Sequence, residues 1–255
     1  MSDWTPLASS WAKFHRAGTH LDALNAALGR IANDPEAVTV ERQFEGREAS
    51  LVVTRVPDMR ETGLIMGDAV NCLRAALDHL VWDLVQMGTH PALTPQQAKQ
   101  VQFPFAGNLT EFRNQRERRA PGVSDAEWLL IRRYQPYRRD DRGQALRRLR
   151  DLSDTDKHRY IYPTFIAPVD FRGTIGLINC AADAIWQRRP QRPLNVGVKL
   201  VRIRLVDVGP DHDVQIESQL TLQPSIGRAV ALGPALGAIR ETVLDVLSRF
   251  EARLA

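Results

Sequence analysis

The chain has 255 residues, of which 44% are apolar and 25% charged, and its net charge at pH 7 is +4. This apolar content, together with so little net charge, excludes an intrinsically disordered protein, because burial of these side chains can offset chain entropy. The two cysteines, Cys72 and Cys180, exclude a disulfide scaffold and a CxxC metal clip. Since the first residues lack a leader pattern and charges interrupt the most apolar helix, we expect a cytoplasmic protein that does not enter a membrane.

The first predicted element is a long amphipathic helix that ends near Asp34. Its apolar residues recur at spacings of three, four and seven, which is typical of a helix with one buried face. They are Trp4, Leu7, Trp11, Phe14, Leu21, Leu24, Leu28 and Ile31. Apolar and polar residues then alternate over residues 38–56 around a turn at Gly46, which predicts a β-hairpin. Helical spacing returns from about Arg60 to Met87, so a second helix should pack against the first in a bundle.

The middle of the chain predicts shorter elements. Residues 90–123 are rich in turn signals, which favours short helices only. Ser124 and Glu127 have the spacing of a capping box at the start of a third helix, and Pro136 ends that helix. A fourth helix is predicted over about residues 143–160, with its leucines facing inward.

The last third of the chain returns to strands and ends in a helix. β-branched residues at even spacing predict strands over residues 162–222, with a turn at Gly209-Pro210-Asp211, and helical spacing resumes over residues 234–254. Because helices bracket the strands, we predict an α+β fold, a helical bundle with a β-hairpin insertion and a small antiparallel sheet. This predicts a single domain, residues 1–255, with a helical core at about 1–35, 60–160 and 234–255 and β-rich parts at about 36–58 and 162–223.

A row of polar residues interrupts the apolar second helix. At about 100° per residue, Asn71, Arg74 and Asp78 lie within about 60° of one another, next to apolar residues that indicate a covered face. The fourth helix repeats the pattern, because its inward register passes from leucines to Asp156 and then Arg159. We therefore predict ion pairs between the two helices, Arg74 with Asp156 and Asp78 with Arg159.

Two interpretations of this cluster stay open. As a structural ion network, it would fix the register of two helices, and the loss of one partner would cost about 3 to 5 kcal/mol. As a catalytic or ligand-binding pocket, it would use His79 or His158 as the titratable group and an arginine to hold an anion. The candidate catalytic residues are then Arg74, Asp78, His79, Asp156, His158 and Arg159. We expect neither a metal nor a cofactor, because the chain has no HxxxH or HExxH spacing and no glycine-rich phosphate loop.

Four blocks of sequence, taken in order, resemble a family of uncharacterised bacterial proteins. The blocks are Gly67-Asp68-Ala69-Val70-Asn71-Cys72-Leu73-Arg74-Ala75-Ala76-Leu77-Asp78-His79-Leu80-Val81-Trp82, Phe103-Pro104-Phe105, Gln135-Pro136-Tyr137 and Asp156-Lys157-His158-Arg159. They cover roughly residues 64 to 160. This resemblance implies no known activity.

Arg74 and His79 also match the motif of an arginine followed, after four to six residues, by a histidine. This spacing resembles the motif of the HEPN superfamily of helical ribonucleases. The resemblance implies metal-independent RNA cleavage at a homodimer interface. Arg74 would steady phosphate charge and His79 would transfer protons at the ribose 2′-hydroxyl, as these side chains are able to do.

The positive charge of the chain is concentrated in one segment. Residues 111–150 hold twelve arginines and six acidic residues, a net charge of +6, so the rest of the chain carries −2. With Tyr134 and Tyr137 among them, these arginines would form an RNA-binding face on which bases stack. The alternative is a solvated surface of mixed charge.

Three functions follow from these patterns. The first is an interaction or scaffold protein with a buried polar network between two helices. The alternative is a HEPN-like, metal-independent ribonuclease of toxin or defence type, and the second alternative is a binder of small ligands. The sequence alone leaves open whether the protein is an enzyme.

Overall fold

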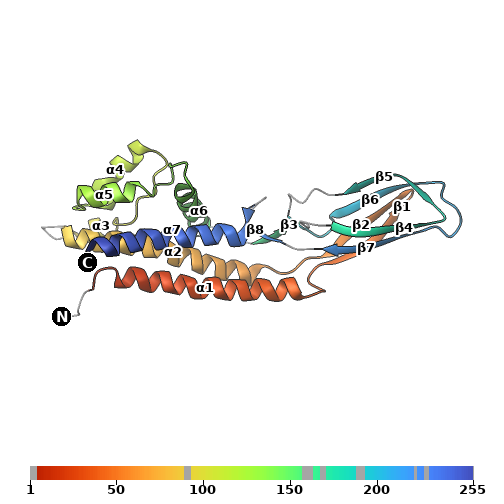
Figure 1. Ribbon diagram of the computed structural model, residues 1–255, viewed down its shortest axis with the longest axis horizontal. Coiled ribbons are helices and arrows are strands. Elements are labelled where there is room, and N and C mark those ends of the chain that lie inside the picture. Colours follow the sequence, from red (N-terminus) through yellow and green to blue (C-terminus); the bar gives the residue numbers. More distant parts are fainter. Residues whose placement is uncertain are drawn as a thin grey trace. The chain divides into compact units, whose positions relative to one another are not determined.

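The computed structural model describes residues 5–88, 93–156, 163–166, 171–187, 193–220, 223–226 and 230–254. These residues have the α+β fold that the sequence predicts (Figure 1). The helices are α1 (Ala8–Asn33), α2 (Arg60–Gly88), α3 (Pro95–Ala98), α4 (Leu109–Arg119), α5 (Asp125–Arg132), α6 (Asp141–Asp156) and α7 (Leu232–Leu254). The strands are β1 (Thr39–Glu45), β2 (Glu48–Arg55), β3 (Thr164–Ile166), β4 (Phe171–Ile178), β5 (Ala181–Gln187), β6 (Lys199–Val206), β7 (Asp213–Leu220), β8 (Gln223–Ile226) and β9 (Val230–Ala231).

The chain forms two compact units. Unit 1 comprises residues 1–24, 63–161 and 234–255, and unit 2 comprises residues 25–62 and 162–233. Unit 1 holds most of the helical residues and unit 2 holds the strands. The sequence predicts a single domain with helical and β-rich parts. Its boundaries between the two parts nevertheless lie within a few residues of those between the units, except that the end of α1 groups with the strands.

The core of unit 1 surrounds α2. Leu73 and Leu77 are fully buried, as the apolar stripe predicts, and Val81 and Val85 beside the polar row are fully buried too. The leucine face of α2 is therefore buried, whereas the mixed face is covered only in part. Trp82, on the polar side of the helix, is 38% exposed.

Local sequence explains the short helices of unit 1. Asn108 caps α4 by accepting the Glu111 N–H at 2.8 Å. Ser124 and Glu127 form the predicted capping box at the start of α5. At the far end of α5, the buried Tyr134 hydroxyl donates to Asp245 of α7 at 2.8 Å. Caps thus fix where these helices begin, and this hydrogen bond ties the end of α5 to the bundle.

Among the described residues, unit 2 contains three antiparallel sheets, whereas the sequence predicts a β-hairpin and one small antiparallel sheet. Their strand orders are β1-β2-β6-β5, β3-β8-β9 and β4-β7. The turn predicted at Gly209 joins β6 and β7, but these strands belong to different sheets and form no hairpin. Asp207 and Asp211 both adopt positive φ angles, 49° and 55°, which redirect the chain between them. As a result Ile203 of β6 and Val214 of β7 are buried in one shared core.

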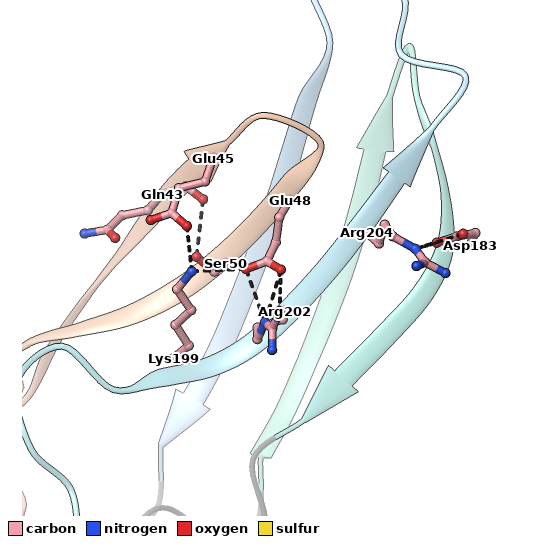
Figure 2. A network of polar contacts seen from close by, with 8 residues as sticks. All are labelled: Gln43, Glu45, Glu48, Ser50, Asp183, Lys199, Arg202 and Arg204. Carbon is pink, nitrogen blue, oxygen red and sulfur yellow. Dashed lines mark hydrogen bonds and ion pairs between the residues drawn. The ribbon is translucent and has the colours of Figure 1, made fainter.

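The solvent face of the four-stranded sheet carries ion pairs between neighbouring strands (Figure 2). Glu48 of β2 meets Arg202 and Lys199 of β6 at 2.7 and 3.1 Å, and Arg204 of β6 meets Asp183 of β5 at 2.7 Å. Hydrogen bonds from Arg202 and then Lys199 lower the pKa of Glu48 to about 2. Because about half of the Arg202 side chain is exposed, solvent screens these pairs and they contribute little to stability. We interpret this face as a solvated surface on which charged residues of neighbouring strands pair.

Candidate functional site

The polar row of α2 meets the loop that precedes α4. Arg74 is at the middle of the row, and only 11% of its side chain is exposed. Its Nε lies 3.5 Å from Oδ1 of Asp78, one turn along the helix, and its guanidinium lies over the Phe105 ring, 4.0 Å from the centroid. Asp78 Oδ1 also accepts the Phe103 N–H at 2.9 Å. The row therefore contacts the loop through a cation–π contact from Arg74 and a backbone hydrogen bond to Asp78, and the ion pair holds these two side chains together.

A second contact joins α2 to α6. Asn71 Nδ2 donates to Asp156 Oδ2 at 2.7 Å. A Cβ atom at Gly67 would lie 2.5 Å from Asp156 Oδ1, so only a glycine lets this carboxylate come so close to α2. In place of the predicted pair with Asp156, Arg74 pairs with Asp78 on its own helix, because i and i+4 side chains are neighbours on a helix surface. We call Asn71, Arg74, Asp78, Phe103, Phe105 and Asp156 the polar centre.

Among the described residues, Arg74 has unpartnered donors, and a second arginine lies close to the polar centre. Within the part of the chain that the structure describes, Arg74 Nε and Nη1 are buried without a hydrogen-bond partner. Arg119 is close by: burial lowers its pKa, the positive charges of Arg118 and Arg74 lower it further, and Asp78 opposes them. The two arginines could bind an anion, and the contacts of the polar centre hold α2 against α6 and against the loop before α4.

A buried glutamine forms hydrogen bonds close to the Phe103-Pro104-Phe105 block. Gln135 is fully buried, its Oε1 accepts the Ala106 N–H at 3.1 Å, and its Nε2 donates to the Ile131 carbonyl at 3.2 Å. Ala106 directly follows the Phe103-Pro104-Phe105 block. Hydrogen bonds therefore link the block that begins at Gly67 to Phe103 and to Asp156, the first residue of the fourth block, and Gln135 bonds to the residue that follows the Phe103 block.

His79 lies apart from the polar centre. Its Nδ1 forms a hydrogen bond with Oγ of Ser9 on α1. One turn later, Asp83, which is 4% exposed, accepts the Leu7 N–H at 2.8 Å. Arg74 and His79 thus contact different elements, the loop before α4 and the start of α1. The structure brings together Arg74 and Asp78 and connects them through α2 to Asp156, but it does not place His79 with them.

Two predicted site residues, His158 and Arg159, lie outside the described residues. The predicted ion pair between Asp78 and Arg159 lies outside them as well.

Sequence reasoning missed two parts of this arrangement. The sequence places Phe103 and Phe105 in a turn-rich stretch and in one of the four blocks but predicts no contact with the polar row, although one supplies an N–H group and the other a ring to the polar centre. Asp83 counts only as an interruption of an apolar helix. Its position one turn after His79 is the signal that both face the same neighbour, since i and i+4 residues share a helix face.

The arginine-rich segment, residues 111–150, splits into two groups. Four of its arginines form ion pairs with acidic residues: Arg116 with Asp125, Arg138 with Asp140, Arg142 with Asp245 and Arg150 with Asp151. Two more donate to backbone carbonyls, Arg119 to Gln100 and Arg147 to Pro136. The side chains of the remaining six have no partner among the residues described here: Arg113, Arg118, Arg132, Arg133, Arg139 and Arg148. The segment therefore keeps a large part of its positive charge uncompensated.

Comparison with protein-family models, with curated proteins and with solved structures finds no match. Across the described ranges, the structure contains no group of three or more histidine, cysteine or acidic side chains arranged to hold a metal ion. Nor does any helix in those ranges have the length and apolar character needed to cross a membrane.

Proposed function

We propose that this protein is a non-enzymatic interaction protein that binds RNA through the arginine-rich segment. One observation carries the proposal: six of the twelve arginines in this segment have no side-chain partner among the described residues. A surface of mixed charge that only meets water would pair its arginines with the acids beside them. Guanidinium groups without partners are suited to phosphates, which they bind through two parallel N–H donors.

The polar centre has a structural role in this proposal. Asp78 and Asn71 both form hydrogen bonds to other elements, the first to the loop before α4 and the second to α6. Arg74 is held between Asp78 and the Phe105 ring. These contacts tie the arginine-rich helices to α2, which favours the structural network over the catalytic pocket. The centre would give the RNA-binding face a fixed shape.

The proposal is tested by binding of a fluorescent 20-nucleotide single-stranded RNA to the full chain over a range of salt concentrations. Each phosphate contact contributes about 0.7 to the slope of log affinity against log salt for single strands. The triple variant Arg133→Gln/Arg139→Gln/Arg148→Gln should therefore lower that slope by about 2 and weaken binding at all salt concentrations.

A matched control removes the same charge elsewhere. Arg16, Arg30 and Arg47 are exposed and lie outside the arginine-rich segment. Their replacement by glutamine should leave the slope within about 0.5 of the wild-type value, because contacts made directly with phosphates set the slope. The proposal is wrong if the wild type does not retain RNA at low salt, or if this control loses as much affinity as the first triple variant.

The HEPN-like ribonuclease remains the alternative, and the same samples test it. A catalytic pair would need Arg74 and His79 at one scissile phosphate, whereas their contacts point to Phe105 and to Ser9. The interaction protein should leave the RNA intact in the presence of a metal chelator. Cleavage that disappears in His79→Ala would favour the ribonuclease instead.

A further inference from the structure

A pocket of about 400 Å³ opens between α4 and α5. Its apolar lining comes from Leu109 and Phe112 of α4 and from Trp128 and Leu129 of α5. Its polar lining consists of arginines from both helices, with no acidic residue among them. A pocket of this volume accommodates small ligands, whose sites typically span about 300 to 1,000 Å³.

The aromatic lining of the pocket is closely packed. The Phe112 and Trp128 rings stack with their centroids 4.1 Å apart and an angle of 14° between their planes, and both rings are buried. Arg116 forms one wall, and it is held in place because Nη1 pairs with Asp125 at 2.6 Å and Nη2 donates to the Val123 carbonyl at 2.8 Å. Since these groups already have partners, a ligand would meet a preformed surface, which lowers the entropic cost of binding.

Arg113 and Arg132 supply the charge that lacks a partner. One comes from α4 and the other from α5, both line the pocket, and neither side chain has a partner in the described ranges. Two like charges that share one pocket repel each other, so an anion bound between them would relieve the repulsion and accept hydrogen bonds from both. Leu129 beside them is 54% exposed, which leaves an apolar surface for the rest of the ligand.

We infer that this pocket binds one nucleotide, with its phosphate between Arg113 and Arg132 and its base against the exposed side chain of Leu129. A nucleotide combines the two features that the lining requires, a flat ring with apolar faces and an anionic group at one end. The nucleotide is one unit of a bound RNA strand or a free mononucleotide. For the RNA strand, the inference rests on the function proposed above.

The experiment measures AMP binding to the full chain by calorimetry, with adenosine as the probe that lacks the phosphate. AMP should bind at least tenfold more tightly than adenosine, and Arg113→Gln or Arg132→Gln should each weaken AMP binding about tenfold, as expected for a lost charge-assisted hydrogen bond. Arg16→Gln is the matched control, because Arg16 is exposed, lies outside the arginine-rich segment and does not line the pocket. It should change AMP affinity by less than about twofold. Circular dichroism melting of each variant shows that it is folded.

Competition between AMP and the RNA strand separates the two sources of the nucleotide. If AMP displaces the RNA and the pocket variants weaken both, the pocket holds a nucleotide of the strand. If AMP binds in the pocket but the protein retains no RNA, the ligand is a free nucleotide and the proposed RNA-binding function is wrong. If RNA binds while AMP does not, or AMP affinity is the same in the pocket variants, the nucleotide pocket is refuted and RNA binding stands.

Discussion

Replacement of Arg74 by glutamine tests whether the polar centre is structural. The Arg74 and Asp78 side chains are 11% and 28% exposed. Exposed pairs contribute less than about 1 kcal/mol, whereas disruption of a fully buried pair costs about 3 to 5 kcal/mol. The Phe105 ring, 4.0 Å from the guanidinium, adds a cation–π contact that the glutamine also loses. We therefore expect Arg74→Gln to lower the free energy of unfolding by about 2 kcal/mol, between these limits.

A double-mutant cycle assigns this loss to the pair. In a chain of this size, about 2 kcal/mol corresponds to a fall in Tm of about 4 to 8 °C, measured by thermal melting. Asp78→Asn should cost a similar amount, and the double variant should cost less than the sum of the two by about 1 kcal/mol, because the second change removes a contact already lost. Arg133→Gln is the control, since this exposed arginine lies outside the polar centre and should change stability by less than about 0.5 kcal/mol.

The result that refutes the structural role is an unchanged or higher Tm in Arg74→Gln. Residues held for binding or catalysis often reduce stability, so their removal leaves it unchanged or raises it. In that case Arg74 would be a ligand-binding residue, and its buried Nε and Nη1 donors would be the groups that bind the ligand.

Three more predictions concern other contacts of the two units. Asp83→Ala should lower the free energy of unfolding, measured in urea, by about 1 to 3 kcal/mol, because the Leu7 N–H loses its acceptor. Asp83→Asn keeps an acceptor oxygen and should lower it less. Equal losses in the two variants would contradict this role. Hydrogen bonds lower the pKa of Glu48 to about 2, so any stability from this carboxylate should be present above pH 4.5 and lost as the pH falls through about 2. An NMR titration of the Glu48 carboxyl with a midpoint near 4.5 would disprove the pairing. Burial, and then the hydrogen bond to Asp245, raise the pKa of Tyr134 to about 12, so its contribution to stability should be present below pH 10 and lost as the pH rises through about 12; a phenolate signal that appears near pH 10 in every tyrosine would rule this out.

Much of the fold could be predicted from local sequence. The apolar spacing of α2 and α7 and the capping box at Ser124 each depend on residues within a few positions of one another. The two sheets that meet at Val214 could not be predicted in this way. A turn sequence such as Gly209-Pro210-Asp211 shows that the chain changes direction, whereas the partner of each strand depends on which apolar faces can be buried together.

The candidate site, too, could be predicted from local sequence only in part. The sequence by itself determined which polar residues share one side of α2, because helix geometry fixes the angle between Asn71, Arg74 and Asp78. Only the tertiary structure decided their partners, since the Phe103 N–H, the Phe105 ring and the Asp156 carboxylate come from distant parts of the chain. The same holds for the arginine-rich segment. Its positive charge is a property of composition, but the pairing of Arg116 and the absence of partners for Arg113 and Arg132 within the described ranges arise from how α4 packs against α5.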